Sequence, residues 1–155
     1  MAPLHYLVID EDGALHHRTA PVYTDALDEV GPEGWNRIQL TRTVAGFVND
    51  VALVSSTYTR NVTGGLVLMA FGSPQIPYAG PIVFTGWDPT ATRMGRTEVT
   101  TLTPLTSAMI IAAHALISEV LSDTTHAPND LVTEVLNLGE MVSVGQAPTM
   151  TALIR

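Results

Sequence analysis

The chain has 155 residues and a mass of 16.6 kDa; 46% of the residues are hydrophobic and 14% are charged. This length fits one globular domain over residues 1–155, and the apolar fraction excludes a disordered chain. Seven arginines, no lysine and fifteen acidic residues give a net charge of −8. Proteins that hold phosphates or anionic membranes need clustered cations, so direct nucleic-acid binding and membrane binding are not expected.

The sequence has no cysteine, which excludes disulfides, thiolate metal sites and cysteine nucleophiles. We expect a cytoplasmic protein, because no basic and apolar leader is visible at the N-terminus. Two long stretches lack acids and arginine, residues 61–87 and 99–118. Glycines, prolines or polar residues interrupt both, so they are interpreted as core and not as membrane spans. Acid is concentrated in residues 1–33, where seven carboxylates oppose Arg18 alone.

The N-terminal elements are predicted to form a β-hairpin. Residues 4–9 are an apolar run suited to a strand, and Asp10-Glu11-Asp12-Gly13 is a turn signal. Residues 14–18 return as the second strand. A loop of four residues would place Val8 opposite Leu15 across the hairpin.

A short helix and two strands should follow the hairpin. Thr24 predicts the N-cap of a helix over residues 25–30, and Gly31 is suited to end it. Runs of apolar residues predict strands at 35–40 and 44–48.

The middle of the chain leaves alternatives open. Residues 51–59 suit either a strand or the approach to a helix. Residues 62–71 suit a helix capped by Asn61, but Gly64-Gly65 weakens a helix and makes a strand the rival. Residues 82–85 form a continuous apolar run between glycines, which indicates a short buried strand.

The last third contains the strongest helix signal. A loop at 90–96 and a strand at 98–102 should precede Thr103-Pro104, which is a typical helix start. The helix should extend to about Leu121. More than half of its surface is apolar, so it is either the central core helix or part of a subunit interface.

Beyond this helix we expect a second one at 130–138 and strands at 141–144 and 150–154. The predicted fold class is therefore α+β. A mixed or antiparallel sheet should pack against one long apolar helix, at about 104–121, and against shorter helices.

The segment Gly80-Pro81-Ile82-Val83-Phe84-Thr85-Gly86 has the pattern of a known family, as do Asn49 at a strand end and Asn61 at a helix start. Residues 4–88 resemble a domain-of-unknown-function family of small proteins encoded by phages, plasmids and other mobile elements. The resemblance implies a mobile-element setting and, for a phage protein, the cytoplasm of the host cell. It implies no reaction, because the family brings no catalytic residues to carry over.

Polar residues gather at predicted element ends, and they form the candidate ligand site. If the strands at 44–48 and 82–85 are neighbours that run the same way, these residues converge on one edge of the sheet. An arginine would clamp an anion, a tryptophan would stack on a ring, and amides and carboxylates would read polar groups. The predicted ligand-binding residues are Asn49, Asp50, Arg60, Asn61, Thr85, Trp87 and Asp88. The alternative interpretation is that they are turn residues and a tryptophan covering the core.

No metal site, cofactor or catalytic residue is predicted. His16 and His17 are adjacent on a strand and point to opposite faces, so they cannot bind one metal together. The glycine-rich segments match no phosphate-binding fingerprint.

The leading functional hypothesis is a non-enzymatic accessory protein of a mobile element. It would bind a host protein or a small nucleotide-like molecule, with counter-defence as one such role. One alternative is a small hydrolase or nucleotide-modifying enzyme built around Asn49, Asp50, Arg60 and Asp88. Another is a structural or assembly protein that forms homo-oligomers through the helix at 104–121.

Overall fold

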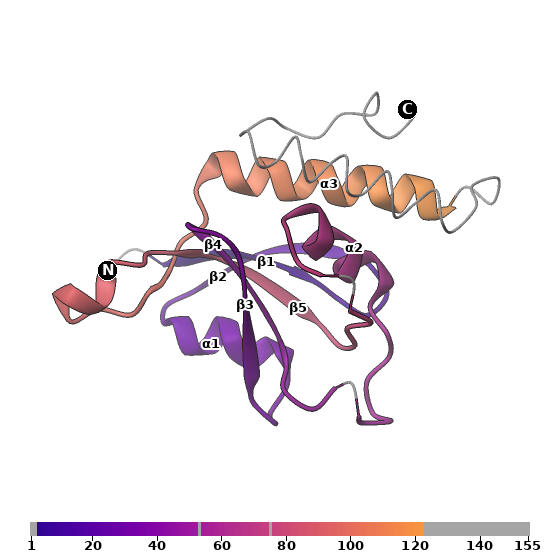
Figure 1. The fold of residues 1–155 in the computed structure, drawn as a ribbon, viewed down its shortest axis with the longest axis horizontal. Helices are drawn as coiled ribbons and strands as arrows, with labels where there is room; N and C mark the ends of the chain where they lie inside the picture. Colours follow the sequence, from indigo (N-terminus) through magenta and orange to yellow (C-terminus); the bar gives the residue numbers. More distant parts are fainter. Residues whose placement is uncertain (1–2, 53, 75, 123–155) are drawn as a thin grey trace.

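The computed structural model describes residues 3–52, 54–74 and 76–122, which form an antiparallel six-stranded sheet with helices on both faces. Helices α2 and α3 lie on one face, and α1 lies on the other (Figure 1). The strand order is β2-β1-β5-β4-β3, and β6 pairs with the end of β5. This arrangement confirms the α+β class and the antiparallel form of the predicted sheet.

The bounds of the elements agree with most of the sequence predictions. The expectations at 130–138, 141–144 and 150–154 lie outside the described residues. In chain order the elements are β1 (Leu4–Ile9), β2 (Leu15–Ala20), α1 (Tyr23–Leu27), η1 (Asp28–Val30), β3 (Trp35–Thr41), β4 (Val44–Asn49), α2 (Val62–Ala70), β5 (Ile82–Trp87), η2 (Ala91–Met94), β6 (Val99–Thr100) and α3 (Pro104–Ser122).

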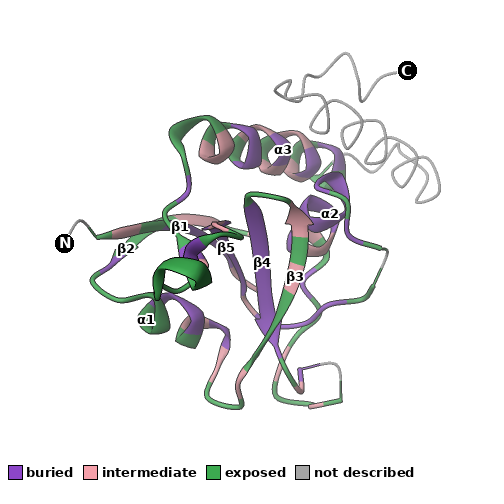
Figure 2. Cartoon of the chain, turned by 60° about the vertical axis from the view of Figure 1, so that its left-hand side comes forward, coloured by how far each residue is buried: buried purple, intermediate pink, exposed green. Residues whose placement is uncertain are grey.

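Strands β1, β4 and β5 form the centre of the sheet and are buried on both faces (Figure 2). Side chains that alternate along each strand supply two separate apolar clusters. Leu7, Ile82 and Phe84 belong to the cluster under α2 and α3. Phe47 and Val83 belong to the cluster under α1. Removal of this apolar area from water on both faces is the main stabilisation of the sheet.

The predicted register of the first hairpin is wrong by one residue. Val8 pairs with His16 and not with Leu15, which lies opposite Ile9. The loop has three residues and not four, because the Asp10 N–H donates to the Ala14 carbonyl at 3.0 Å. Gly13 closes this loop at φ +88°, a conformation that favours glycine.

The predicted start of the first helix is also wrong. Helix α1 begins at Tyr23, and Val22 is its N-cap residue, with no side-chain cap bond from Thr24. The helix tightens into the 3₁₀ turn η1 and ends at Gly31, which has φ +127°. The end was therefore predicted correctly, because it depends on the local freedom of a glycine.

The two alternatives left open in the middle of the chain are decided by the structure. Residues 62–70 are the helix α2, and the Asn61 side chain caps it by accepting a bond from Gly64 N–H at 2.9 Å. The described residues between 51 and 59 form neither a helix nor a named strand.

Helix α3 begins at Pro104, as predicted, and packs against α2. By length and apolarity alone it would be able to cross a membrane. Met109, Ile110 and Ile117 on its inner side are buried in the core cluster, while only 28% of its apolar stretch is buried within the described structure. Leu105 and Ile111 lie on its outer side, with 64% and 43% of their surface exposed.

Gly86 allows β6 to approach β5 closely. Gly86 pairs with Thr100, and Trp87 pairs with Val99. A Cβ atom at position 86 would collide with the carbonyl oxygen of Thr101 and lie 3.0 Å from that of Thr100. These are backbone atoms, so they cannot move aside without separating the two strands.

We expect Gly86→Ala to lower the free energy of unfolding by about 2 kcal/mol, because the added methyl group forces β6 away from β5. Urea denaturation measures the change. Gly65→Ala is the matched control, because its Cβ atom would lie 3.8 Å from the nearest atom. That helix substitution should stabilise the protein by up to about 1 kcal/mol. Equal stability of Gly86→Ala and the wild type would contradict the close approach.

Candidate functional site

The predicted polar site on one edge of the sheet is not formed. Strands β4 and β5 are neighbours, as expected, but they run antiparallel: Val44 pairs with Gly86, and Phe47 pairs with Val83. The ends of antiparallel strands lie at opposite ends of a sheet. The prediction that the two strand ends converge is therefore wrong, and the seven candidate residues fall into two groups.

Asn49 and Asp50 lie at the end of β4, where Asn49 is a structural residue. Its side chain is 4% exposed and donates to the Val30 carbonyl at 3.0 Å and to Glu33 Oε1 at 3.2 Å. Its Oδ1 accepts the N–H of Val51 at 2.9 Å. Asp50 is exposed and accepts a bond from Asn36 Nδ2 at 2.6 Å.

Asn61 lies at the same end and also serves the fold. Its Nδ2 donates to the carbonyls of Ile9 at 2.9 Å and Gly80 at 3.0 Å, while its Oδ1 caps α2. The residue is 1% exposed. One buried side chain thus joins β1, α2 and the turn before β5, and no polar atom of it remains for a ligand.

Arg60 is exposed beside this junction, and its backbone forms a bridge with Ala79. The cavity that it lines has a volume of about 40 Å³, and no carboxylate is among the described residues around it. Asp88 lies at the other end of β5. The hydrolase site predicted from Asn49, Asp50, Arg60 and Asp88 is therefore not assembled.

Thr85 and Trp87 are on β5. Thr85 is fully buried, and its hydroxyl donates to the Gly86 carbonyl at 2.9 Å, so it cannot contact a ligand. Trp87 is half-buried, and the Arg37 guanidinium lies 4.3 Å from the centre of its ring. This cation–π contact uses a ring that was expected to stack on a ligand.

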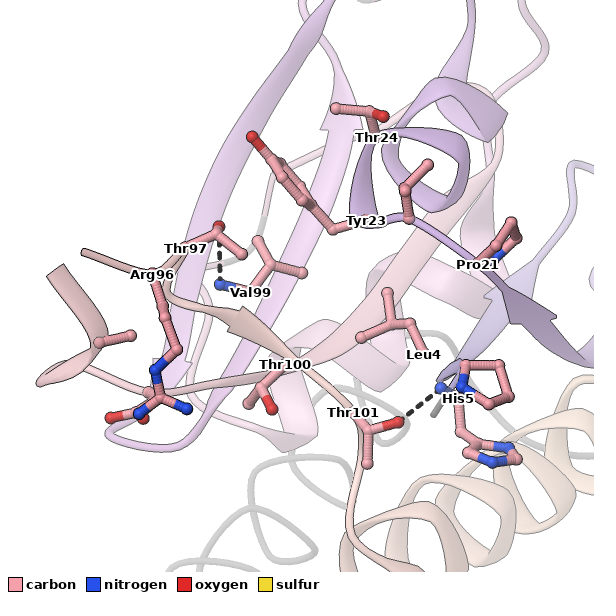
Figure 3. A pocket seen from close by; sticks show the side chains of 14 residues that line it. Leu4, His5, Pro21, Tyr23, Thr24, Arg96, Thr97, Val99, Thr100 and Thr101 are labelled. Atoms are coloured by element: carbon pink, nitrogen blue, oxygen red, sulfur yellow. Dashed lines mark hydrogen bonds between the residues drawn. The ribbon is translucent and has the colours of Figure 1, made fainter. Parts of the chain in front are cut away.

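Asp88 lines a large cleft of about 840 Å³ between the start of β1, the start of α1 and β6. Figure 3 shows Tyr23 and Thr24 on one side of the cleft, Arg96 and Thr97 on another, and Leu4 and Val99 between them. Its lining residues are Pro3, Leu4, His5, Pro21, Val22, Tyr23, Thr24, Asp88, Ala91, Arg96, Thr97, Val99, Thr100 and Thr101. The volume is that of a site for a small organic molecule.

A carboxylate and a guanidinium stand in this mostly apolar cleft. The hydroxyl and the backbone N–H of Thr90 both donate to Asp88 Oδ1, at 2.8 and 3.0 Å. These bonds, with a smaller contribution from the charge of Arg96, hold the pKa of Asp88 below its usual value. Arg96 donates to Met94 Sδ at 2.9 Å and forms no ion pair with any described carboxylate.

The sequence analysis did not predict most of the residues that line the cleft. Only Asp88 is shared between the predicted site and the lining residues. Arg96 and Tyr23 are distant in sequence, and the fold alone brings them to one cleft. A weak signal existed in the four threonines of residues 97–103, which place hydroxyl groups next to Arg96.

Two of the threonine hydroxyls that line the cleft bond backbone groups. The hydroxyls of Thr101 and Thr97 accept backbone N–H groups, from His5 at 2.5 Å and Val99 at 3.3 Å, and neither contacts a general base. No group of three His, Asp or Glu side chains among the described residues is placed to hold a metal ion.

No protein-family model, curated protein or solved structure matches the chain.

We expect Asn61→Ala to lower the free energy of unfolding by about 3 kcal/mol, because it removes three buried hydrogen bonds, to the carbonyls of Ile9 and Gly80 and from the N–H of Gly64. Asn36→Ala is the control, because among the described residues this exposed side chain bonds Asp50 alone. The substitution should change the free energy of unfolding by less than about 1 kcal/mol. Chemical denaturation compares the two variants. A stable Asn61→Ala protein would return Asn61 to the list of candidate ligand residues.

Thr90→Val should raise the pKa of Asp88 toward its ordinary value, because it removes the hydroxyl that most favours the ionised form. Titration of the carboxyl carbon by NMR measures this pKa. Thr92→Val is the control, because the Thr92 hydroxyl donates to Glu98 instead. If the pKa of Asp88 is the same in wild type and Thr90→Val, the hydroxyl does not control the charge in the cleft.

Proposed function

We propose that this protein is a non-enzymatic binding protein whose cleft captures a small molecule with an aromatic or apolar body and an anionic group. One observation carries the proposal: the 840 Å³ cleft combines apolar walls with Arg96, which has no carboxylate partner among the described residues. A guanidinium placed in such a cleft recognises carboxylate or phosphate groups with directed hydrogen bonds.

The other cleft residues support a nucleotide-like ligand. Tyr23 is 38% exposed at the start of α1, where its ring is open to stack on a flat group. Asp88 stays ionised at neutral pH and accepts hydrogen bonds from amino or hydroxyl groups. A nucleotide would contact all three side chains, with its phosphate near Arg96, its base against Tyr23 and its sugar near Asp88.

The cellular role follows from the mobile-element resemblance of residues 80–86 and belongs to the same proposal. A phage or plasmid protein that holds a nucleotide-like molecule without converting it lowers the free concentration of that molecule in the host. Sequestration of this kind is a means of counter-defence, and it needs no catalytic residue.

The proposal is tested with adenosine and guanosine 5′-monophosphates as probes. They should cause saturable NMR shifts at Val99 and Thr100, and Arg96→Gln should weaken binding about tenfold, which is 1.4 kcal/mol. Arg60→Gln is the matched control, because Arg60 is also an exposed arginine without a described carboxylate partner. Tyr23→Ala should weaken the nucleotides and leave inorganic phosphate unchanged. Absence of saturable binding, or equal affinity in Arg96→Gln, would refute the assignment.

A further inference from the structure

Strand β3 is an edge of the sheet with unpaired backbone groups. It is last in the strand order and pairs only with β4 among the described residues. The Asp50 N–H donates to the Gly34 carbonyl at 3.1 Å, so the backbone of Gly34 faces β4. Because the backbone direction alternates along an antiparallel strand, the backbone groups of Asn36 and Ile38 also face β4. The N–H and C=O groups of Trp35 and Arg37 point outward. Such an edge is a template for another strand.

A groove lies along one side of this edge. Its volume is about 320 Å³, enough for the side chains of an added strand. Ile38 and Val48 supply its floor from β3 and β4, and Ile76 and Tyr78 supply its far wall from the segment before β5. Asn36, Asn49 and Asp50 also line it, so apolar and polar residues lie together beside the outward backbone groups.

The other side of the edge carries the aromatic and cationic groups that dominate protein interfaces. Trp35 is 44% exposed and packs edge to face on Phe47, with ring centres 5.3 Å apart. Arg37 is held over the ring of Trp87 and forms no ion pair with a described carboxylate. Both side chains are already ordered by these contacts, which reduces the entropy cost of binding a partner.

The opposite edge of the sheet lacks these features. Strand β2 carries the consecutive ionisable residues His16, His17 and Arg18. Charged side chains on an edge discourage pairing with another chain. Arg18 is in addition bound to Glu29 at 2.9 Å.

We propose that β3 binds an extended segment of a partner protein as an added strand, in which apolar side chains alternate with acidic ones. The apolar side chains enter the groove beside Ile38, and the acidic ones lie over Arg37 on the other side. Arg42, in the turn after β3, adds a second positive charge at that end of the edge. Main-chain bonds to Trp35 and Arg37 supply affinity, and the alternation supplies specificity. This surface is separate from the cleft, so the inference is independent of the proposed ligand.

The test uses a capped peptide, Val-Glu-Val-Glu-Val-Glu-Val, and the full chain labelled with ¹⁵N. Binding should slow hydrogen exchange at the amides of Trp35 and Arg37 by at least about tenfold. Two further peptides carry N-methyl groups on alternate residues, one on the valines and one on the glutamates. Only one set of amides faces β3, so one methylated peptide should lose binding and the other should keep it.

Variants define the role of charge. Arg37→Gln should weaken the peptide about tenfold, and Arg60→Gln should not. A peptide with lysine in place of glutamate should bind at least about tenfold more weakly. The proposal is overturned if millimolar peptide leaves the β3 amides unchanged, or if both methylated peptides bind equally. It is also overturned if light scattering of the free chain shows a dimer with these amides already protected, because a second copy would then occupy the edge.

Discussion

The antiparallel pairing of β4 with β5 determines most of this structure. It places Phe47 beside Val83 and Gly46 beside Phe84 at the centre of the sheet, where both faces are covered. The same pairing sends the end of β4 and the end of β5 to opposite ends of the molecule. The polar residues that follow β4 therefore lie far from the polar residues that follow β5.

The separation also divides the charges. The turn Asp10-Glu11-Asp12, Glu33 and Asp50 lie at the end where β1 and β4 finish. The end where β5 finishes carries Arg42, Arg93 and Arg96 beside Asp88 and Glu98. Three of the seven arginines of a chain with a net charge of −8 thus lie at the end where the cleft is located.

Two asparagines at the ends of elements form hydrogen bonds with backbone groups. Asn49 and Asn61 are almost fully buried, and their amide groups bond the main chain of segments distant in sequence. A buried amide with all its partners inside the protein stabilises the junction that it joins. The carboxylates at strand ends are less buried: Asp50 is exposed and Asp88 is partly exposed.

The sequence alone determined the α+β class, most element positions and the start of α3, because proline and apolar runs act over a few residues. It left residues 62–71 open between a helix and a strand. It did not determine the hairpin register, the direction of β5 relative to β4, or which polar residues are buried. These depend on contacts between distant segments. The cleft exists only because β6 and α1 meet beside the start of β1. Only the tertiary structure therefore decided where Arg96 and Asp88 lie, and that they lie apart from Arg60.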